Sequence, residues 1–358
     1  MTDLKIYLAA NASLCLAIGG LLIGLAFGAL TQRANFCTMG SIASWITLDD
    51  ARGLRAWALA VAIATGAVAI LTAYGALDPA LTMYASPRLN WVTNSLGGLM
   101  FGFGMVLAGG CASRNLVRAG AGDLRSALTL LVTCLFATMT LGGILGPLRA
   151  SLEQWTAITL PMPTQRLPDM MSGMVGPSAD LVLPLTISLI LFAVCFADKP
   201  FRTSRRHLAI GVGVGALVAG SWAITGLAYD EFAERIHLPV SLSFVKPSAD
   251  AFDWLERYTA LGMPGFAVAS VFGTFLGGAL TAYAGGRFRL MAFADKNDTL
   301  RHMAGAALMG IGGVLAAGCS IGQGISGLST LSIGSILATG GIIGGTVIGI
   351  KWLQDGDH

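Results

Sequence analysis

Long apolar runs, separated by short polar segments, dominate the chain from residue 11 onward. A helix needs roughly 20 mostly apolar residues to cross the hydrocarbon core of a bilayer, which is about 30 Å thick. Nine runs approach this length: residues 11–30, 56–77, 92–110, 126–146, 181–197, 207–228, 265–284, 303–319 and 331–350. The pattern predicts an all-α polytopic membrane protein with about nine transmembrane helices.

Two longer connections, residues 149–180 and 229–264, are amphipathic and contain prolines. They are too short to form soluble domains. We therefore expect short helices at the membrane surface in both, for example from Phe252 to Tyr258.

The composition fits a lipid environment and excludes several other classes of protein. Hydrophobic residues make up 54% of the chain and charged residues 11%, whereas soluble domains carry about 25% charged residues. The net charge of +3 is spread between the apolar runs, so no nucleic-acid partner is expected. The six cysteines form no CxxC pair and no cluster with histidine, so we predict no metal site and no cofactor.

The Lys and Arg residues fall unevenly on the connections between the runs. Taken alternately, one set of connections holds 15 of the 22 basic residues and the other set holds seven. Basic residues collect on the cytoplasmic side of a membrane. The bias predicts insertion in a bacterial inner membrane with the N-terminus outside and the C-terminus in the cytoplasm.

An internal repeat divides the chain into two related parts. Residues 98–111 match residues 306–319 at an offset of 208, and both segments end in a cysteine. The match pairs the first four runs with the last four and leaves the fifth alone, so the second copy would be inverted. The predicted parts are a first half-unit in residues 1–160, a connector in residues 181–206 and a second, inverted half-unit in residues 207–358. Inverted repeats of this 4+1+4 kind are common in transporters.

Glycines and small polar residues surround the two repeated cysteines and predict breaks in the helices there. Irregular backbone is tolerated at membrane depth only where it is buried in protein or lines a cavity. Free backbone N–H groups and helix N-termini at such breaks would attract an anion. The expected breaks lie at Gly109, Gly110, Gly318, Gly322 and Gly324.

Three cysteines are the strongest functional candidates. Cys111 and Cys319 occupy matching places in the repeat, and Cys37 follows the first run with no thiol counterpart in the second copy, near Tyr229. The other three cysteines lie among Leu, Val and Phe inside runs and are expected to be structural. The candidate pathway residues are Cys37, Cys111, Cys319, Arg33, Asn35, Arg114, Asn115, Ser320 and Gln323.

Through the segments RANFCTMG, AGGCASRN and AAGCSIGQG and the duplicated layout, the chain resembles the YeeE/YedE family of sulfur-compound transporters. The resemblance implies uptake of thiosulfate through an hourglass-shaped interior, with the three functional cysteines at Cys37, Cys111 and Cys319. It also implies a small cytoplasmic sulfurtransferase as a partner and no enzymatic activity. Roles with selenium compounds in some relatives leave the substrate open.

The charges of the chain indicate how such an anion would move. No Asp, Glu or His falls in the middle of a predicted run, so no ion-coupling group is evident and we expect facilitated, channel-like passage. Protonated thiols could donate weak hydrogen bonds to the solute. Two alternatives stay open: a membrane thiol or persulfide oxidoreductase, and a transporter of sulfite, sulfide or selenite.

Overall fold

The computed structural model describes residues 11–176, 178–231, 233, 236–293 and 295–356. Residues 1–10, which include the predicted outer N-terminus, lie outside this description. The helices are α2 (Ala12–Ala34), α3 (Thr38–Leu48), α4 (Arg52–Ala73), α5 (Trp91–Leu107), α6 (Ala112–Gly120), α7 (Leu124–Leu141), α8 (Gly146–Thr156), α9 (Leu167–Val175), α10 (Ala179–Ala197), α11 (Lys199–Thr203), α12 (Arg205–Leu227), α13 (Lys246–Glu256), α14 (Tyr258–Leu261), α15 (Phe266–Ala284), α16 (Lys296–Leu315) and α17 (Ile333–Gly356). Three shorter pieces and a π-helical segment complete the described structure: η1 (Pro79–Leu81), β1 (Arg88–Leu89), β2 (Ile158–Thr159) and η2 (Gly322–Gly327).

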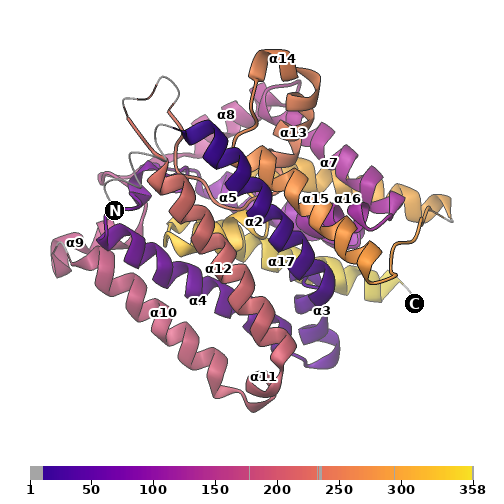
Figure 1. The fold of residues 1–358 in the computed structure, drawn as a ribbon, viewed down its shortest axis with the longest axis horizontal. Coiled ribbons are helices and arrows are strands. Elements are labelled where there is room, and N and C mark those ends of the chain that lie inside the picture. Colours follow the sequence, from indigo (N-terminus) through magenta and orange to yellow (C-terminus); the bar gives the residue numbers. More distant parts are fainter. Residues whose placement is uncertain (1–10, 177, 232, 234–235, 294, 357–358) are drawn as a thin grey trace.

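The all-α architecture predicted from the apolar runs is confirmed (Figure 1). Among the described residues, eight helical segments are long and apolar enough to cross a membrane. The eighth predicted run, residues 303–319, lies mostly in α16, which is not among these eight segments because its first turns carry Lys296, Asp298 and Arg301. The nine-span count and the 4+1+4 arrangement therefore remain predictions.

Both long connections contain the short helices expected there. The connection at residues 149–180 holds most of α8 and all of α9, and the connection at 229–264 holds α13 and α14. Phe252–Tyr258 is not one helix, because α13 ends at Glu256 and α14 begins at Tyr258. The helix α3, between the first two long helices, was not predicted.

The long helices pack in a reciprocal pattern. α2 packs along α15 and α4 along α12, while α5 packs along α17 and α7 along α16. The short helix α3 contacts α4 and α17, and α13 contacts α15 and α7. When α2, α3, α4, α5 and α7 are matched with α12, α13, α15, α16 and α17, each of these contacts has its counterpart.

Glycines bring the backbones of α5 and α16 together at the centre of this pattern. A Cβ atom added to Gly97 would lie 2.4 Å from the amide nitrogen of Ala316, and one added to Gly305 would lie 2.6 Å from that of Ala108. These two contacts exchange under the offset of 208. Small residues let membrane helices approach this closely, so the repeated glycines explain why the two helices cross in contact.

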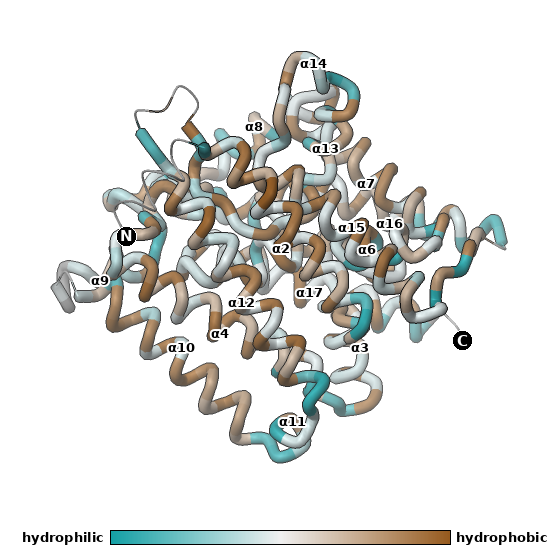
Figure 2. Tube along the Cα trace, viewed as in Figure 1, coloured by the Kyte–Doolittle hydropathy of each residue, from teal (hydrophilic) through white to brown (hydrophobic). Residues whose placement is uncertain are grey.

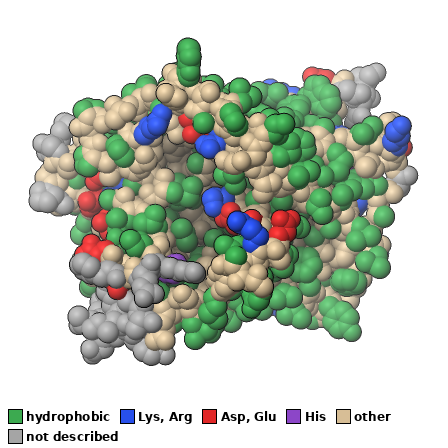
Figure 3. Space-filling model, turned by 90° about the horizontal axis from the view of Figure 1, so that it is seen from above, with side chains coloured by type: hydrophobic (Ala, Val, Ile, Leu, Met, Phe, Trp, Pro, Cys, Tyr) green, Lys and Arg blue, Asp and Glu red, His purple; other side chains and the backbone are tan. Residues whose placement is uncertain are grey.

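The outer surface of the bundle is largely apolar. α10 packs on α4 at the edge of the bundle and is hydrophobic along most of its length, whereas the turn at α11 is hydrophilic (Figure 2). Seen from above, hydrophobic side chains cover much of the molecule, and charged side chains gather in small groups (Figure 3). This distribution fits a protein whose flanks face lipid.

Contacts at one end of the bundle join residues of the more basic set of connections. Arg206 at the start of α12 donates to the carbonyl oxygen of Ala34 at the end of α2, and Arg55 of α4 pairs with Asp198 after α10. Asp123 accepts hydrogen bonds at the start of α7 from the backbone N–H and the side chain of Arg125. The contacts of Arg206 and Arg55 therefore bring the end of α2, the end of α10 and the starts of α4 and α12 to one side of the structure.

Candidate functional site

The structure brings together the three cysteines singled out in the sequence. Cys37 is the N-cap residue of α3 and Cys111 is the N-cap residue of α6, and the two thiols interact with each other. Ser320, next to Cys319, lies beside the Cys111 thiol, so both halves of the chain contribute to the cluster. Cys111 and Cys319 are 2% and 1% exposed, which places the thiols in the interior.

The same local geometry recurs at each of the three thiols. The backbone N–H of Gly322 donates to Cys319 Sγ with an N···S distance of 3.3 Å. The backbone N–H groups of Gly40 and Arg114 interact in the same way with Cys37 and Cys111, three residues before them. Each sulfur thus accepts from a backbone donor, while the Cys37 and Cys111 thiols also interact with each other and Cys111 Sγ lies 3.3 Å from Ser113 Oγ.

Helix breaks occur at Gly109, Gly110 and Gly318, whereas Gly322 and Gly324, also predicted as breaks, lie inside the π-helical segment η2. α5 ends at Leu107 and α6 begins at Ala112, while α16 ends at Leu315 and η2 begins at Gly322. Gly109 has a φ of +67°, and Ala317, its counterpart in the repeat, has a φ of +53°. Both copies therefore turn through the left-handed region just before the cysteine, which is the conformation that ends many helices.

The other glycines of the breaks make room for neighbouring side chains. A Cβ atom on Gly110 would lie 3.2 Å from Arg114 Cγ, and one on Gly318 would lie 3.0 Å from Gln323 Cγ. Gly324 faces Trp57 of α4, whose ring would lie 2.7 Å from an added Cβ atom. These glycines leave room for the side chains of Arg114, Gln323 and Trp57.

Polar residues of the first half-unit surround Cys111. Asn35 Oδ1 accepts a hydrogen bond from Arg114 Nη2, and Asn115 Nδ2 donates to the carbonyl oxygen of Gly110 at 2.9 Å. Arg114 Nη1 is buried and has no hydrogen-bond partner among the described residues. This guanidinium keeps hydrogen-bonding capacity that the protein itself does not use.

Polar residues of the second half-unit surround Cys319. Gln323 Nε2 donates to the carbonyl oxygen of Ala316 at 2.6 Å, while its Oε1 is buried with no partner among the described residues. Two residues that sequence reasoning missed complete this side. Tyr84 donates its hydroxyl to the carbonyl oxygen of Gly322 at 2.9 Å, and Ser243 Oγ lies 3.9 Å from Cys319 Sγ.

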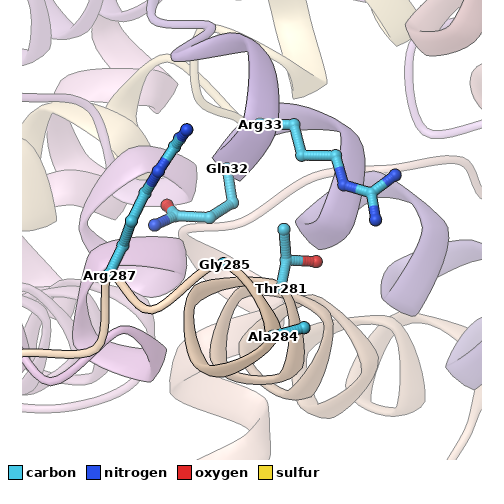
Figure 4. Close-up of a pocket in the computed structure, with 6 residues that line it drawn as sticks. All are labelled: Gln32, Arg33, Thr281, Ala284, Gly285 and Arg287. Carbon is cyan, nitrogen blue, oxygen red and sulfur yellow. The ribbon is translucent and has the colours of Figure 1, made fainter.

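Arg33 does not join the cysteine cluster. It lines a separate pocket with Gln32, Thr281, Ala284, Gly285 and Arg287. Its side chain extends away from Gln32 and Arg287 (Figure 4). The structure therefore places Arg33 apart from Cys37, Cys111 and Cys319, and the pathway role of the predicted residues stays a prediction.

Two pockets approach the cluster from opposite ends of α12. One, of about 240 Å³, is lined by Cys37 and Asn35 together with Arg206 and His207 at the start of α12. The other, of about 400 Å³, reaches Ser243 and Gly318 beside Cys319 and also contains Val240, beyond the end of α12. The thiols therefore lie between two openings.

Three acidic groups at these openings have basic partners. Arg52 hydrogen-bonds to the Asp50 carboxylate in the first pocket and lowers the pKa of Asp50 to about 2. In the second pocket, Arg149 pairs with Glu153 at 2.8 Å and Lys246 with Asp250 at 2.6 Å. The described residues contain no group of three or more His, Cys, Asp or Glu that could hold a metal ion.

Comparison with known sequences agrees with this geometry. The profile of a family described as sulphur transport matches residues 33–348. The chain belongs to this sulphur-transport family. The resemblance to the YeeE/YedE sulfur-compound transporters, suggested by the cysteine motifs, is thereby confirmed.

The chain is also similar to several named transporters. The thiosulfate transporter TsuA of Escherichia coli is 27% identical over 322 residues, which cover 86% of each chain. TsuA of Spirochaeta thermophila is 28% identical over 323 residues, which cover 86% of this chain and 90% of that protein. A shorter match, 33% identical over 107 residues, links 29% of this chain to the probable transporter YedE of Escherichia coli.

Proposed function

We propose that this protein carries thiosulfate into the cell along a passage lined by the thiols of Cys37, Cys111 and Cys319. The observation that carries the proposal is the meeting of these thiols, from both halves of the chain, between two pockets at opposite ends of α12. Membership of a sulphur-transport family and the likeness to two thiosulfate transporters support the same substrate.

The chemistry of the passage suits a sulfur anion. Thiol protons donate weak hydrogen bonds, so they can replace part of the hydration of thiosulfate without holding it too tightly to leave. The helices α3 and α6 present their N-termini at Cys37 and Cys111, and the positive potential there favours negative charge. The one carboxylate that is buried among the described residues is Asp123, and it is paired with Arg118 and Arg125.

We propose facilitated passage without a coupled ion. No histidine and no unpaired carboxylate is buried among the described residues, and ion-coupled transporters generally need such a group within the membrane. A dianion that enters a cell with a negative interior must overcome about 4.6 kcal/mol of electrical work per 100 mV of membrane potential, from about 2.3 kcal/mol per charge. A concentration gradient, maintained by consumption of thiosulfate inside, would have to drive uptake.

The inverted repeat also belongs to the proposal. The half-units would be residues 1–160 and 207–358, joined by the connector at 181–206, in the inner membrane of a bacterium. The reciprocal helix contacts and the exchanged glycine contacts support two copies related by a twofold axis. The basic residues gathered at one end support a cytoplasmic C-terminus.

One observation favours a second candidate, a membrane thiol or persulfide oxidoreductase. Such an enzyme needs two neighbouring cysteines, and the structure places Cys37 beside Cys111. The two functions differ in what they require: passage needs no redox partner, whereas an oxidoreductase must alternate between thiol and disulfide or persulfide states. Mass spectrometry of the purified protein during uptake would detect that alternation.

Labelled thiosulfate uptake into proteoliposomes tests the proposed function. We expect uptake with the purified protein and none with empty liposomes. Uptake that unlabelled sulfite, sulfide or selenite suppresses better than thiosulfate would assign another substrate. Growth of a sulfur-auxotrophic host on thiosulfate as its sole sulfur source, with and without the chain, gives the cellular counterpart.

The sulfurtransferase implied by the family resemblance would consume thiosulfate at the cytoplasmic opening. We propose it as a partner on chemical grounds, because removal of the anion would sustain the gradient. Co-purification of a soluble sulfurtransferase with the membrane protein, lost when residues 199–206 in α11 and the start of α12 are changed, would support the partnership.

A further inference from the structure

The two sides of the thiol cluster can be compared residue by residue. The offset of 208 that relates Cys111 to Cys319 also relates α3 to α13, because Thr38–Leu48 becomes Lys246–Glu256. The structural counterpart of Cys37 is therefore Val245, the N-cap residue of α13. This corrects the expectation that it would lie near Tyr229.

Equivalent contacts surround the two central cysteines. Asn35 corresponds to Ser243, and Arg114 corresponds to Gly322. Asn35 accepts a hydrogen bond from Arg114, and a Cβ atom on Gly322 would lie 2.4 Å from Ser243 Oγ. The contact between the loop before α3 and the start of α6 is thus equivalent to the contact between the loop before α13 and the start of η2.

The chemistry at these equivalent places is not the same. On the side of Cys111 there are a second thiol, Cys37, and a guanidinium, Arg114. On the side of Cys319 the corresponding residues are Val245 and Gly322, which offer neither a thiol nor a charge. The pseudo-twofold relation is therefore broken at the two residues that would contact an anion most strongly.

Arg114 also differs from the other arginine of α6. Arg118 pairs with the buried Asp123 at 2.6 Å, so its charge is neutralised by the protein. Arg114 has no salt bridge among the described residues, and its Nη1 is buried without a partner. The positive charge interacts with the Cys37 and Cys111 thiols. It is available to a negatively charged solute at those thiols.

We propose that the passage holds two unequal anion stations, and that Arg114 makes the inner station, with Cys37 and Cys111, the tighter of the two. The outer station consists of Cys319 and Ser243, with the N–H of Gly322 donating to the Cys319 sulfur. The inference rests on the proposed function, since it ranks two points along the same passage. An anion that has passed Cys319 meets the Arg114 guanidinium at the inner station, which lies next to the pocket lined by Arg206 and His207.

Binding of thiosulfate to purified variants tests the ranking. A hydrogen bond to a charged group contributes enough for Arg114→Gln to weaken equilibrium binding of thiosulfate about tenfold or more. Arg114→Lys keeps the charge but loses the planar fork of donors, so we expect binding at least about threefold weaker than in the wild type. Arg202→Gln, an exposed arginine on α11, removes the same charge away from the thiols and should bind like the wild type.

Uptake rates separate this inference from the proposed function. With Arg114→Gln, the thiosulfate concentration for half-maximal uptake should rise about tenfold while uptake at saturation persists. Wild-type affinity in Arg114→Gln, with thiosulfate uptake intact, would overturn the ranking and leave the function standing. Absence of thiosulfate binding by the wild type itself would instead overturn the function.

Two further outcomes complete the test. If Arg114→Gln is not recovered as a folded protein, Arg114→Lys decides, and unchanged affinity in that variant contradicts the inference. A loss of affinity from Cys319→Ala larger than the loss from Arg114→Gln would place the tighter station on the outer side, against the proposal.

Discussion

A backbone N–H group three residues further along the chain interacts with each of the three central thiols, at Gly40, Arg114 and Gly322. This arrangement fixes each sulfur beside a backbone donor. It needs a chain that ends one helix and starts another element at the cysteine. The helix breaks and the thiols therefore act together, and neither alone would provide the contacts proposed for the anion.

Asp123 is a buried carboxylate whose loss should lower the stability of the protein. It is 1% exposed and pairs with Arg118 and Arg125. Asp123→Asn leaves both guanidinium groups without their carboxylate. Breaking a buried pair costs about 3–5 kcal/mol, and partial exposure of the arginines reduces this to about 2 kcal/mol. A lower melting temperature in detergent at pH 7 would show the loss.

The pH dependence of this difference follows from the pKa of Asp123. Burial alone would raise that pKa, but Arg118, Arg125 and Ser126 outweigh burial and lower it below its usual value. The stabilisation is complete above the usual carboxyl pKa and is lost as the pH falls through the lowered one. The wild type and Asp123→Asn should differ equally at pH 7 and pH 5 and converge only in strong acid. Asp253→Asn, in an exposed pair with Arg257, is the control and should change little.

Cys111 and Cys319 could be identified from the sequence because they occupy equivalent positions in the repeat. Cys37 and Asn35 were found because they lie in one short segment. Tyr84 and Ser243 could not be found, since they reach Gly322 and Cys319 from 238 and 76 residues away in sequence and carry no motif. Arg33 lines another pocket, because proximity in sequence does not determine the side of a helix on which a residue lies.

At the scale of helices, glycine contacts hold the two halves together. α5 and α16 are in contact at two equivalent places. Gly97 faces the backbone of Ala316, and Gly305 faces the backbone of Ala108. The apolar runs predicted these helices with ends displaced by a few residues. The number of spans is harder to predict than their positions. α16 begins with charged residues that precede the predicted apolar run, so the helix as a whole is less apolar than the run.

Alanine substitutions at the two glycines test this helix contact. Gly97→Ala and Gly305→Ala each place a methyl group within about 2.6 Å of the opposite backbone. Overpacking of this kind costs about 1–3 kcal/mol. We expect both variants to lose thermal stability by similar amounts. Gly340→Ala in α17 meets nothing within 4 Å and should be at least as stable as the wild type. A large difference between Gly97→Ala and Gly305→Ala would contradict the twofold relation.

At the scale of the whole molecule, the account requires a defined orientation in the membrane. The more basic end, with Arg206 and Arg55, should face the cytoplasm. Ser86 lies near β1 at the other end and is exposed, and Arg202 is exposed on α11. A membrane-impermeant maleimide should label Ser86→Cys in intact cells and Arg202→Cys only after permeabilisation, with the parent chain as the blank. Labelling in the reverse order would show that the orientation is inverted.

The central claim is that a sulfur anion passes the three thiols where the half-units meet. The most direct measurement is the initial rate of labelled thiosulfate uptake into proteoliposomes that hold equal amounts of protein. Loss of one hydrogen-bonding thiol should lower that rate at least about fivefold in each of Cys37→Ala, Cys111→Ala and Cys319→Ala. Cys15→Ala, a change in α2 outside the cluster, should match the wild type. Wild-type rates in all three cluster variants would contradict the account.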